Sequence, residues 1–129
     1  MNKVLKWVVI IAAIGGGYYF LSQKPEPLGP VVIPALSSLA AEGSVVFQGT
    51  CATCHGANLE GTETGPSLLH PFYGPNHHGD TTIRLAVQMG ARQHHWKFGN
   101  MPPQTKIEEA DIVKLTAYVR EMQRANGVE

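Results

Sequence analysis

Both cysteines of the chain lie in one five-residue segment, Cys51-Ala52-Thr53-Cys54-His55. In a helical turn, two thiols separated by two residues reach two neighbouring substituents of one flat ring, and the imidazole that follows projects toward the centre of that ring. This spacing predicts covalent attachment of one haem through Cys51 and Cys54. It also predicts His55 as an axial ligand of the iron.

Other chemistries of a Cys-x-x-Cys pair require a different context. A framework of structural disulfides is excluded, because the chain has only two cysteines. A structural zinc site needs further ligands at paired spacing, and the second cysteine pair is absent, although histidines remain available. A thioredoxin-like redox motif needs a βαβ context, whereas the sequence around this segment has helical periodicity.

Residues 37–129 predict a small all-α domain that begins with a helix leading to the cysteine segment. Ser37 or Ser38 is expected to cap this helix, and Glu42 is expected in its first turn. From there the helix runs towards Cys51. Three helices with long loops would bury little apolar surface, so the large apolar ring of a haem would complete the core.

Two further helices are expected between long loops. Asp80 or Thr81 is expected to cap the second helix. The capping-box pattern Thr105-Lys106-Ile107-Glu108 predicts the start of the third, and Asn126-Gly127 predicts its end. Apolar residues recur along the third helix at spacings of three and four, which predicts its buried face: Ile112, Leu115, Val119 and Met122.

A second axial ligand decides what a haem can do, because an open iron position permits ligand binding or peroxidase chemistry. Met101 is the predicted sixth ligand, since Pro102 keeps it out of helical geometry on an extended loop. Met89 and Met122 are expected to fill the core. A histidine ligand is the alternative, although histidines in polar loops are mostly solvated: His70, His77, His78, His94 and His95.

The N-terminal residues 1–23 predict a single transmembrane anchor. Val4 to Leu21 is an uncharged run that would span about 27 Å as a helix, close to the hydrocarbon core of a bilayer. Lys3 and Lys6 place the N-terminus in the cytoplasm and the rest of the chain outside it. The alternative is a cleaved signal peptide, but no small-x-small site directly follows the apolar run.

Residues 24–36 predict a linker between the anchor and the domain 37–129. Four prolines favour an extended chain over a helix: Pro25, Pro27, Pro30 and Pro34. At ~3.1 Å per residue, this linker would reach roughly 40 Å. It is expected to hold the domain near the membrane, and an inert spacer would need no different sequence.

The charge pattern argues against a nucleic-acid binder. The whole chain carries ten basic and ten acidic residues. Three of the lysines lie at or before Lys24, so the remainder has seven basic and ten acidic residues and a net charge of −3. No basic stripe of the kind that binds phosphates is present.

From about Ser38 to Gly127 the chain resembles a class I c-type cytochrome. The matching motifs follow in the family's order: Cys51-x-x-Cys54-His55-Gly56, Gly65-Pro66-Ser67-Leu68, Gly99-Asn100-Met101-Pro102 and the last helix. The resemblance implies that Gly43 and Phe47 of the first helix pack across Tyr118 of the last. It also implies that the carbonyl of Pro66 orients the imidazole of His55.

The resemblance further implies an electron carrier rather than an enzyme, with one haem c and no small-molecule substrate. The partners would be redox proteins of a respiratory chain at the periplasmic face of a bacterial inner membrane. Two alternatives stay open. One is a haem enzyme or sensor with an exchangeable sixth ligand. The other is a copper- or haem-handling accessory factor that uses the histidine pairs His77-His78 and His94-His95.

We expect the haem absorbance in the membrane fraction of cells that express the full chain. Optical spectra of membranes and soluble extract, oxidised and reduced, measure this distribution. A cleaved signal would instead put the absorbance in the soluble extract, which would contradict the predicted anchor at Val4 to Leu21.

Overall fold

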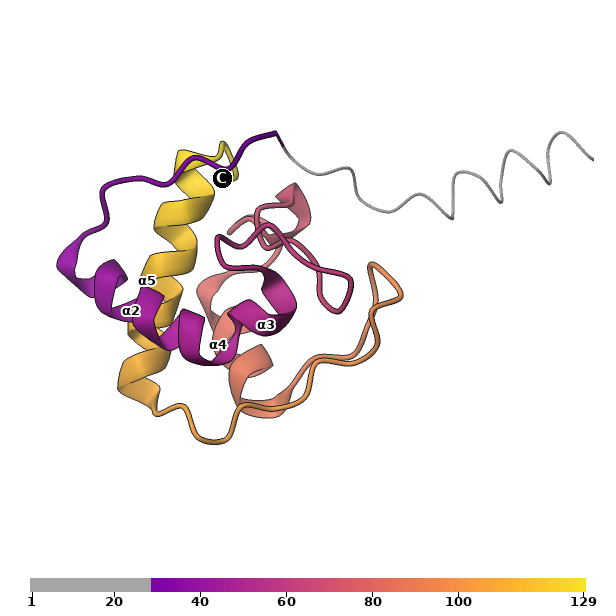
Figure 1. Cartoon of the computed structure of the whole chain (residues 1–129). Helices are drawn as coiled ribbons and strands as arrows, with labels where there is room; N and C mark the ends of the chain where they lie inside the picture. The colour runs from indigo at the N-terminus through magenta and orange to yellow at the C-terminus, as the bar shows by residue number, and fades with distance from the viewer. Residues whose placement is uncertain (1–28) are drawn as a thin grey trace, which may run out of the picture.

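The computed structural model describes residues 29–129, and the segment Val4 to Leu21 lies outside the described residues. Within 29–129 the chain forms four α-helices and one 3-10 helix: α2 (Ser38–Thr50), α3 (Ala52–His55), η1 (Pro71–Tyr73), α4 (Asp80–Met89) and α5 (Glu109–Ala125) (Figure 1). This part of the chain contains no strand, only an isolated bridge between Ala91 and Met101. The predicted all-α domain is confirmed. None of the described helices combines the length and apolar character needed to cross a bilayer.

The first described helix begins where the sequence predicted. Ser37 is the N-cap of α2, and its Oγ accepts a hydrogen bond from the backbone N–H of Ala40 at 3.2 Å. The same Oγ donates to the carboxylate of Glu121 on α5 at 2.7 Å. The expectation for Glu42 was wrong, because the first turn of α2 holds no acidic residue. Glu42 instead pairs with Lys114 Nζ at 3.2 Å across the helix crossing.

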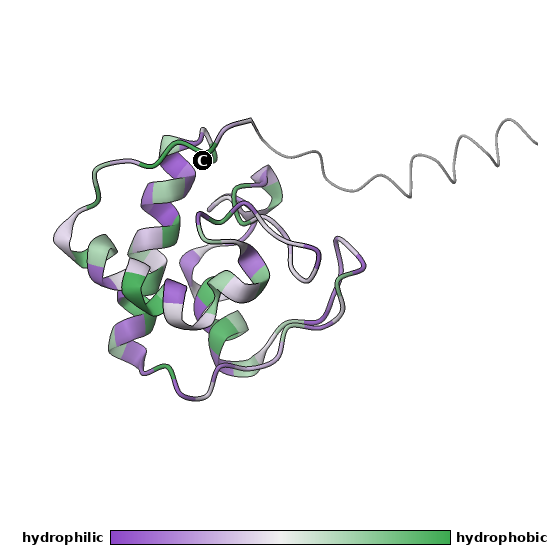
Figure 2. Ribbon diagram, in the orientation of Figure 1, coloured by the Kyte–Doolittle hydropathy of each residue, from purple (hydrophilic) through white to green (hydrophobic). Residues whose placement is uncertain are grey.

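The last helix has the predicted buried face but a different start. Ile112, Leu115, Val119 and Met122 are all buried, as predicted. Hydrophilic and hydrophobic residues are interspersed along the ribbon of α5 (Figure 2). The capping box at Thr105–Glu108 does not open α5, which starts at Glu109 with no side-chain cap on Glu108. Residues 104–107 instead form a turn, closed by a 3.1 Å bond from Ile107 N–H to the Gln104 carbonyl. Ile107 packs against the core from this turn, so residues 104–107 are not part of α5.

The end of α5 was predicted correctly, whereas the start of α4 was not. Asn126 is the C-cap of α5, and Gly127 adopts the expected left-handed conformation (φ +73°). Gly79, rather than Asp80 or Thr81, is the N-cap of α4. Asp80 does not cap, because its carboxylate accepts a hydrogen bond from Arg120 Nε at 2.8 Å.

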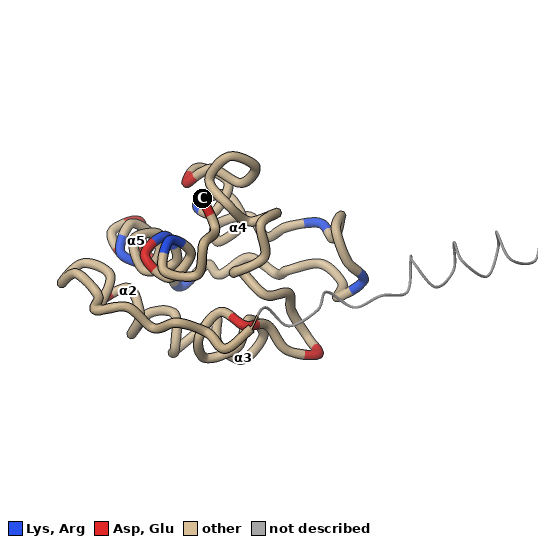
Figure 3. Tube along the Cα trace, turned by 90° about the horizontal axis from the view of Figure 1, so that it is seen from above, with Lys and Arg blue, Asp and Glu red and all other residues tan. Residues whose placement is uncertain are grey.

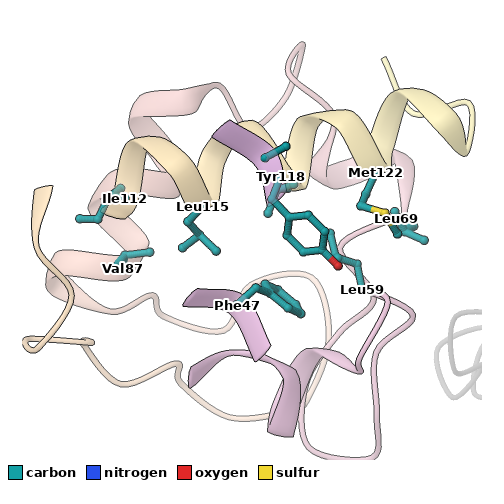
Figure 4. Close-up of a cluster of buried hydrophobic side chains, with 10 residues drawn as sticks. Phe47, Leu59, Leu69, Val87, Ile112, Leu115, Tyr118 and Met122 are labelled. Carbon is teal, nitrogen blue, oxygen red and sulfur yellow. The ribbon is translucent and has the colours of Figure 1, made fainter. Parts of the chain in front are cut away.

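The contact between α2 and α5 organises the core. The backbones approach so closely at Gly43 that an added Cβ would overlap the carbonyl of Lys114. One turn later the rings of Phe47 and Tyr118 pack with centroids 5.4 Å apart (Figure 4). Met122 is fully buried as predicted, but the expectation for Met89 was wrong, since 73% of its surface is exposed.

Part of the predicted linker is docked on the domain. The side chain of Asn126 accepts from Val32 N–H at 2.8 Å and donates to the Val32 carbonyl at 2.9 Å. Val31 and Leu36 pack against the core on either side of this pair. The described residues of the linker therefore run along the end of α5 (Figure 1).

We expect Gly43→Ala to lower the free energy of unfolding by about 3 kcal/mol or more, because the new methyl group meets fixed backbone. Gly49→Ala is the matched control in the same helix. No atom lies within 4 Å of the position that the new methyl carbon would occupy, so it should be neutral or stabilise by about 0.5–1 kcal/mol. Urea unfolding followed by circular dichroism distinguishes the two, and equal midpoints would contradict the close crossing.

Candidate functional site

His55 lies on a short helical turn that continues directly from α2. Cys51 ends α2 with a bond from its N–H to the Phe47 carbonyl at 2.8 Å. Its own carbonyl accepts from His55 N–H at 2.9 Å, which closes the turn of α3. Gly56 then ends this turn with a positive φ of 81°. The position of His55 is therefore set by α2 and, through α2, by the packing on α5.

One ring nitrogen of His55 is already engaged. Its Nδ1 lies 2.9 Å from the carbonyl oxygen of Pro66, which is the contact expected from the sequence. Because a carbonyl only accepts, Nδ1 carries the proton, and Nε2 is left with its lone pair. Burial lowers the pKa of His55, against the smaller raising effect of the Pro66 bond, so the imidazole is held neutral. A neutral imidazole with a free Nε2 is the form that binds iron.

The loop that carries Pro66 folds back on α3. Thr62 Oγ1 donates to the Cys54 carbonyl at 2.7 Å, and Thr62 N–H donates to the Gly65 carbonyl at 2.9 Å. Gly65 lies against Cys54, where a Cβ would come within 2.6 Å of the Cys54 carbonyl oxygen. These contacts bring the Pro66 carbonyl to the imidazole, so glycine at position 65 is a steric requirement.

Met101 is also held in place by backbone hydrogen bonds, so it does not lie on a free loop. Ala91 and Met101 exchange both of their backbone hydrogen bonds, at 3.0 and 2.9 Å. Gly90 precedes this bridge, and a Cβ there would overlap the Met101 carbonyl. Gln104 N–H then bonds the Val87 carbonyl at 2.7 Å, which ties the segment after Met101 to α4.

The predicted ligands open onto one cavity of about 190 Å³. Cys51, His55, Pro66 and Met101 all line it, whereas Cys54 is exposed and lies outside the lining. Apolar side chains of α4 and α5 form much of the remaining wall: Ile83, Ala86, Val87, Leu115 and Val119. An imidazole and a thioether on one apolar cavity are a donor set that suits haem iron. The residues present therefore fit the group.

The two thiols differ in environment. Burial, with a smaller contribution from neighbouring Cys54, raises the pKa of Cys51 to about 11. Cys51 is therefore a protonated thiol at neutral pH, beside the cavity. Cys54, by contrast, is exposed and does not line the cavity.

The histidines outside the cysteine segment were expected to be solvated, and this expectation was wrong for several of them. His78 and His95 are partly buried, and their rings lie 5.4 Å apart. Trp96 also lines the cavity beside them. Desolvation is the main cause that lowers the pKa of both His78 and His95, so these imidazoles are neutral at neutral pH.

Arg120 and Gln123 hold the histidine-bearing loop, and neither was predicted from the sequence. Arg120 donates to the carbonyls of Tyr73 (3.1 Å) and His78 (2.5 Å). Gln123 donates to the carbonyls of Leu68 and Tyr73, both at 2.9 Å. The signal was present for Gln123, because it follows Val119 by four residues and so lies on the predicted apolar face of α5.

A helical turn with two thiols and an imidazole, opening onto an apolar cavity that also holds a thioether, defines a domain suited to a covalently attached haem. Comparison with known families agrees with this class. Residues 40–123 match the family model described as Cytochrome c, and the chain belongs to the cytochrome c family. Membership implies a covalently bound haem c and points to electron transfer.

Among curated proteins, the chain is similar to the cytochrome bc1 complex cytochrome c subunits of Mycobacterium tuberculosis and Mycobacterium bovis. The identity is 31% over 122 residues, which covers 93% of this chain and 39% of each relative. The chain therefore spans about two fifths of the length of these relatives. No solved structure matches it significantly.

We expect Arg120→Met to lower the free energy of unfolding by about 3 kcal/mol or more, because it leaves the His78 carbonyl and the Asp80 carboxylate without their Arg120 donor and the Tyr73 carbonyl with Gln123 alone. Asp80→Asn is the matched control for the other side of the ion pair. The Asp80 side chain is 70% exposed, so its loss should cost less than about 1 kcal/mol. Urea unfolding measures both, and a larger loss in Asp80→Asn would contradict the role assigned to Arg120.

Proposed function

We propose that this protein is an electron carrier with one covalently attached haem c. Cys51 and Cys54 form the covalent links, His55 and Met101 are the two axial ligands, and Pro66 orients His55. The observation that carries the proposal is that His55 and Met101 line the same apolar cavity while backbone hydrogen bonds hold each of them. The attached haem would supply an iron that changes reversibly between ferrous and ferric states.

The residues around the cavity prepare it for electron transfer rather than for chemistry on a substrate. The Pro66 carbonyl fixes the tautomer and ring plane of His55. The bridge to Ala91 fixes the backbone of Met101. With both ligands held in advance, the ligand set need not change when the charge of the iron changes. A filled sixth position would also keep small ligands from the iron, which is why we propose a carrier and no enzymatic activity or small-molecule substrate.

The similarity to bc1 complex cytochrome c subunits supports redox partners in a respiratory chain. We place the protein at the periplasmic face of a bacterial inner membrane, with Val4 to Leu21 as a single-pass anchor. The support is the uncharged run and its flanking lysines. Residues 24–36 would connect the anchor to the domain 37–129.

The charges of the domain argue against a nucleic-acid partner, because acidic residues outnumber basic ones. Acidic residues lie in the loop after α3, and basic residues lie in the loop after α4, residues 91–100 (Figure 3). A redox partner would meet both signs, so electrostatic steering would orient the domain rather than simply attract it.

We expect Met101→Ala to lose the weak far-red band of the oxidised protein, which reports the bond between methionine sulfur and iron. The reduced variant should bind carbon monoxide rapidly, and its reduction potential should fall by about 0.1 V or more, within the roughly 0.8 V range that axial ligands control. Absorption spectra and potentiometric titration measure these changes.

Met89→Ala is the matched control, because Met89 is 73% exposed and does not line the cavity. It should leave the band and the potential unchanged. Rapid stoichiometric binding of carbon monoxide by the unaltered reduced protein would contradict the carrier and favour an enzyme or sensor with an exchangeable ligand.

A further inference from the structure

We propose that His77, His78 and His95 form a binding site for a divalent transition-metal ion, Zn²⁺ or Cu²⁺, separate from the haem iron. One ring nitrogen from each histidine lies within 4.8 Å of the other two. His77 and His78 precede α4, and His95 lies in the loop after α4, residues 91–100. The fold therefore brings together two loops that are distant in the sequence.

The spacing of the nitrogens is close to what a metal requires. A tetrahedral ion with metal–nitrogen bonds of about 2.0–2.1 Å places its ligand nitrogens about 3.3–3.4 Å apart. The three rings have centroid separations of 4.7 Å between His77 and His78, and of 5.4 Å from His95 to each of them. The nitrogens lie within 4.8 Å of one another, so they would have to close by at most about 1.5 Å to reach that separation.

The hydrogen bonds of His78 and His94 provide a second, independent observation. Nδ1 of His78 faces the Phe72 carbonyl at 2.5 Å, and Nδ1 of His94 faces the Arg92 carbonyl at 2.8 Å. Both Nδ1 atoms must therefore carry the proton, and in neutral rings both Nε2 atoms carry a lone pair. These two Nε2 atoms lie 3.4 Å apart, where two lone pairs repel unless a proton or a metal ion lies between them.

Zinc and copper ligands in proteins share this arrangement, in which the second ring nitrogen donates to a carbonyl and fixes the tautomer. The 3.4 Å separation also matches one edge of the tetrahedron. His94 lies outside the group of three, so its ring would have to move toward His77 and His95 to supply a fourth ligand beside His78.

His95 adds an unsatisfied atom to the same cluster. Its Nε2 is buried and has no hydrogen-bond partner among the described residues. Burying a polar nitrogen without a partner is unfavourable, and coordination to a metal would satisfy it. The buried lone pair therefore points to a ligand that the histidines share.

The chemistry of the cluster selects the class of metal. Its ligands are imidazole nitrogens and include no carboxylate, which favours zinc or copper and disfavours calcium and magnesium. A cation beside the cluster, Arg120, donates to the His78 carbonyl and is paired with Asp80 at 2.8 Å. That pairing offsets the repulsion a metal ion would otherwise meet.

The metal site borders the cavity of the proposed haem. His78 and His95 line the same cavity as His55 and Met101. A divalent ion there adds positive charge beside the iron, which stabilises the ferrous state and raises the reduction potential. This coupling rests on the proposed function, whereas the metal site itself does not.

Calorimetric titration of the full, haem-loaded chain with ZnCl₂ tests the site. We expect one saturable site per chain, weakened at least tenfold in His77→Gln and in His95→Gln. His77 is exposed, so its variant should fold normally. His70→Asn is the matched control, because asparagine keeps an acceptor for the Phe72 N–H and His70 lies outside the cluster. Its affinity should stay within twofold.

No saturable binding, or equal affinity in all four proteins, would overturn the metal site. Titration with Cu²⁺ followed by electron paramagnetic resonance should show hyperfine coupling to several nitrogens, and coupling to none would also overturn it. A reduction potential that rises with Zn²⁺ in the unaltered protein but not in His77→Gln would support the coupling. A potential unchanged by bound Zn²⁺ would overturn the coupling.

Discussion

The close approach of α2 and α5 at Gly43 is the contact on which the site depends. It fixes the direction of α2, and α2 runs without a break into the turn that carries Cys51 and His55. The same α5 reaches the opposite wall through Arg120, which holds the loop before α4 by its carbonyls. One helix therefore positions both sides of the cavity, and only a residue without a side chain allows that distance.

The two proposed iron ligands are held in the same way, although they come from different parts of the chain. His55 is oriented by a carbonyl, and Met101 is placed by a pair of backbone bonds. Backbone groups cannot rotate away as side chains can, so each ligand is positioned before a haem is attached. The side chains nearby are mostly apolar, which lowers the local dielectric and strengthens the effect of any charge placed beside the iron.

The sequence was informative where the determinants are local. The spacing of Cys51 and His55, the proline after Met101 and the cap at Ser37 each act over a few residues. Two contacts between distant positions, Phe47 with Tyr118 and Pro66 with His55, were expected only through the resemblance. Other features set by distant contacts were missed or wrong. Asp80 bonds a residue forty positions away rather than capping its own helix. The histidine cluster forms only because the loop before α4 contacts the loop after it, residues 91–100. No pattern in the sequence predicts that contact.

The docking of Val32 on Asn126 changes how far the domain can travel from its proposed anchor. With Val31 and the residues after it held on the domain, at most seven residues, 24–30, would separate the docked chain from the proposed anchor. At ~3.1 Å per residue they reach roughly 22 Å instead of roughly 40 Å. The volume open to a tethered domain scales with the cube of this reach, so its effective concentration near a membrane-bound partner would rise roughly sixfold. In the proposed anchored carrier, two hydrogen bonds to one asparagine would thus help to set how often the domain and its partner meet.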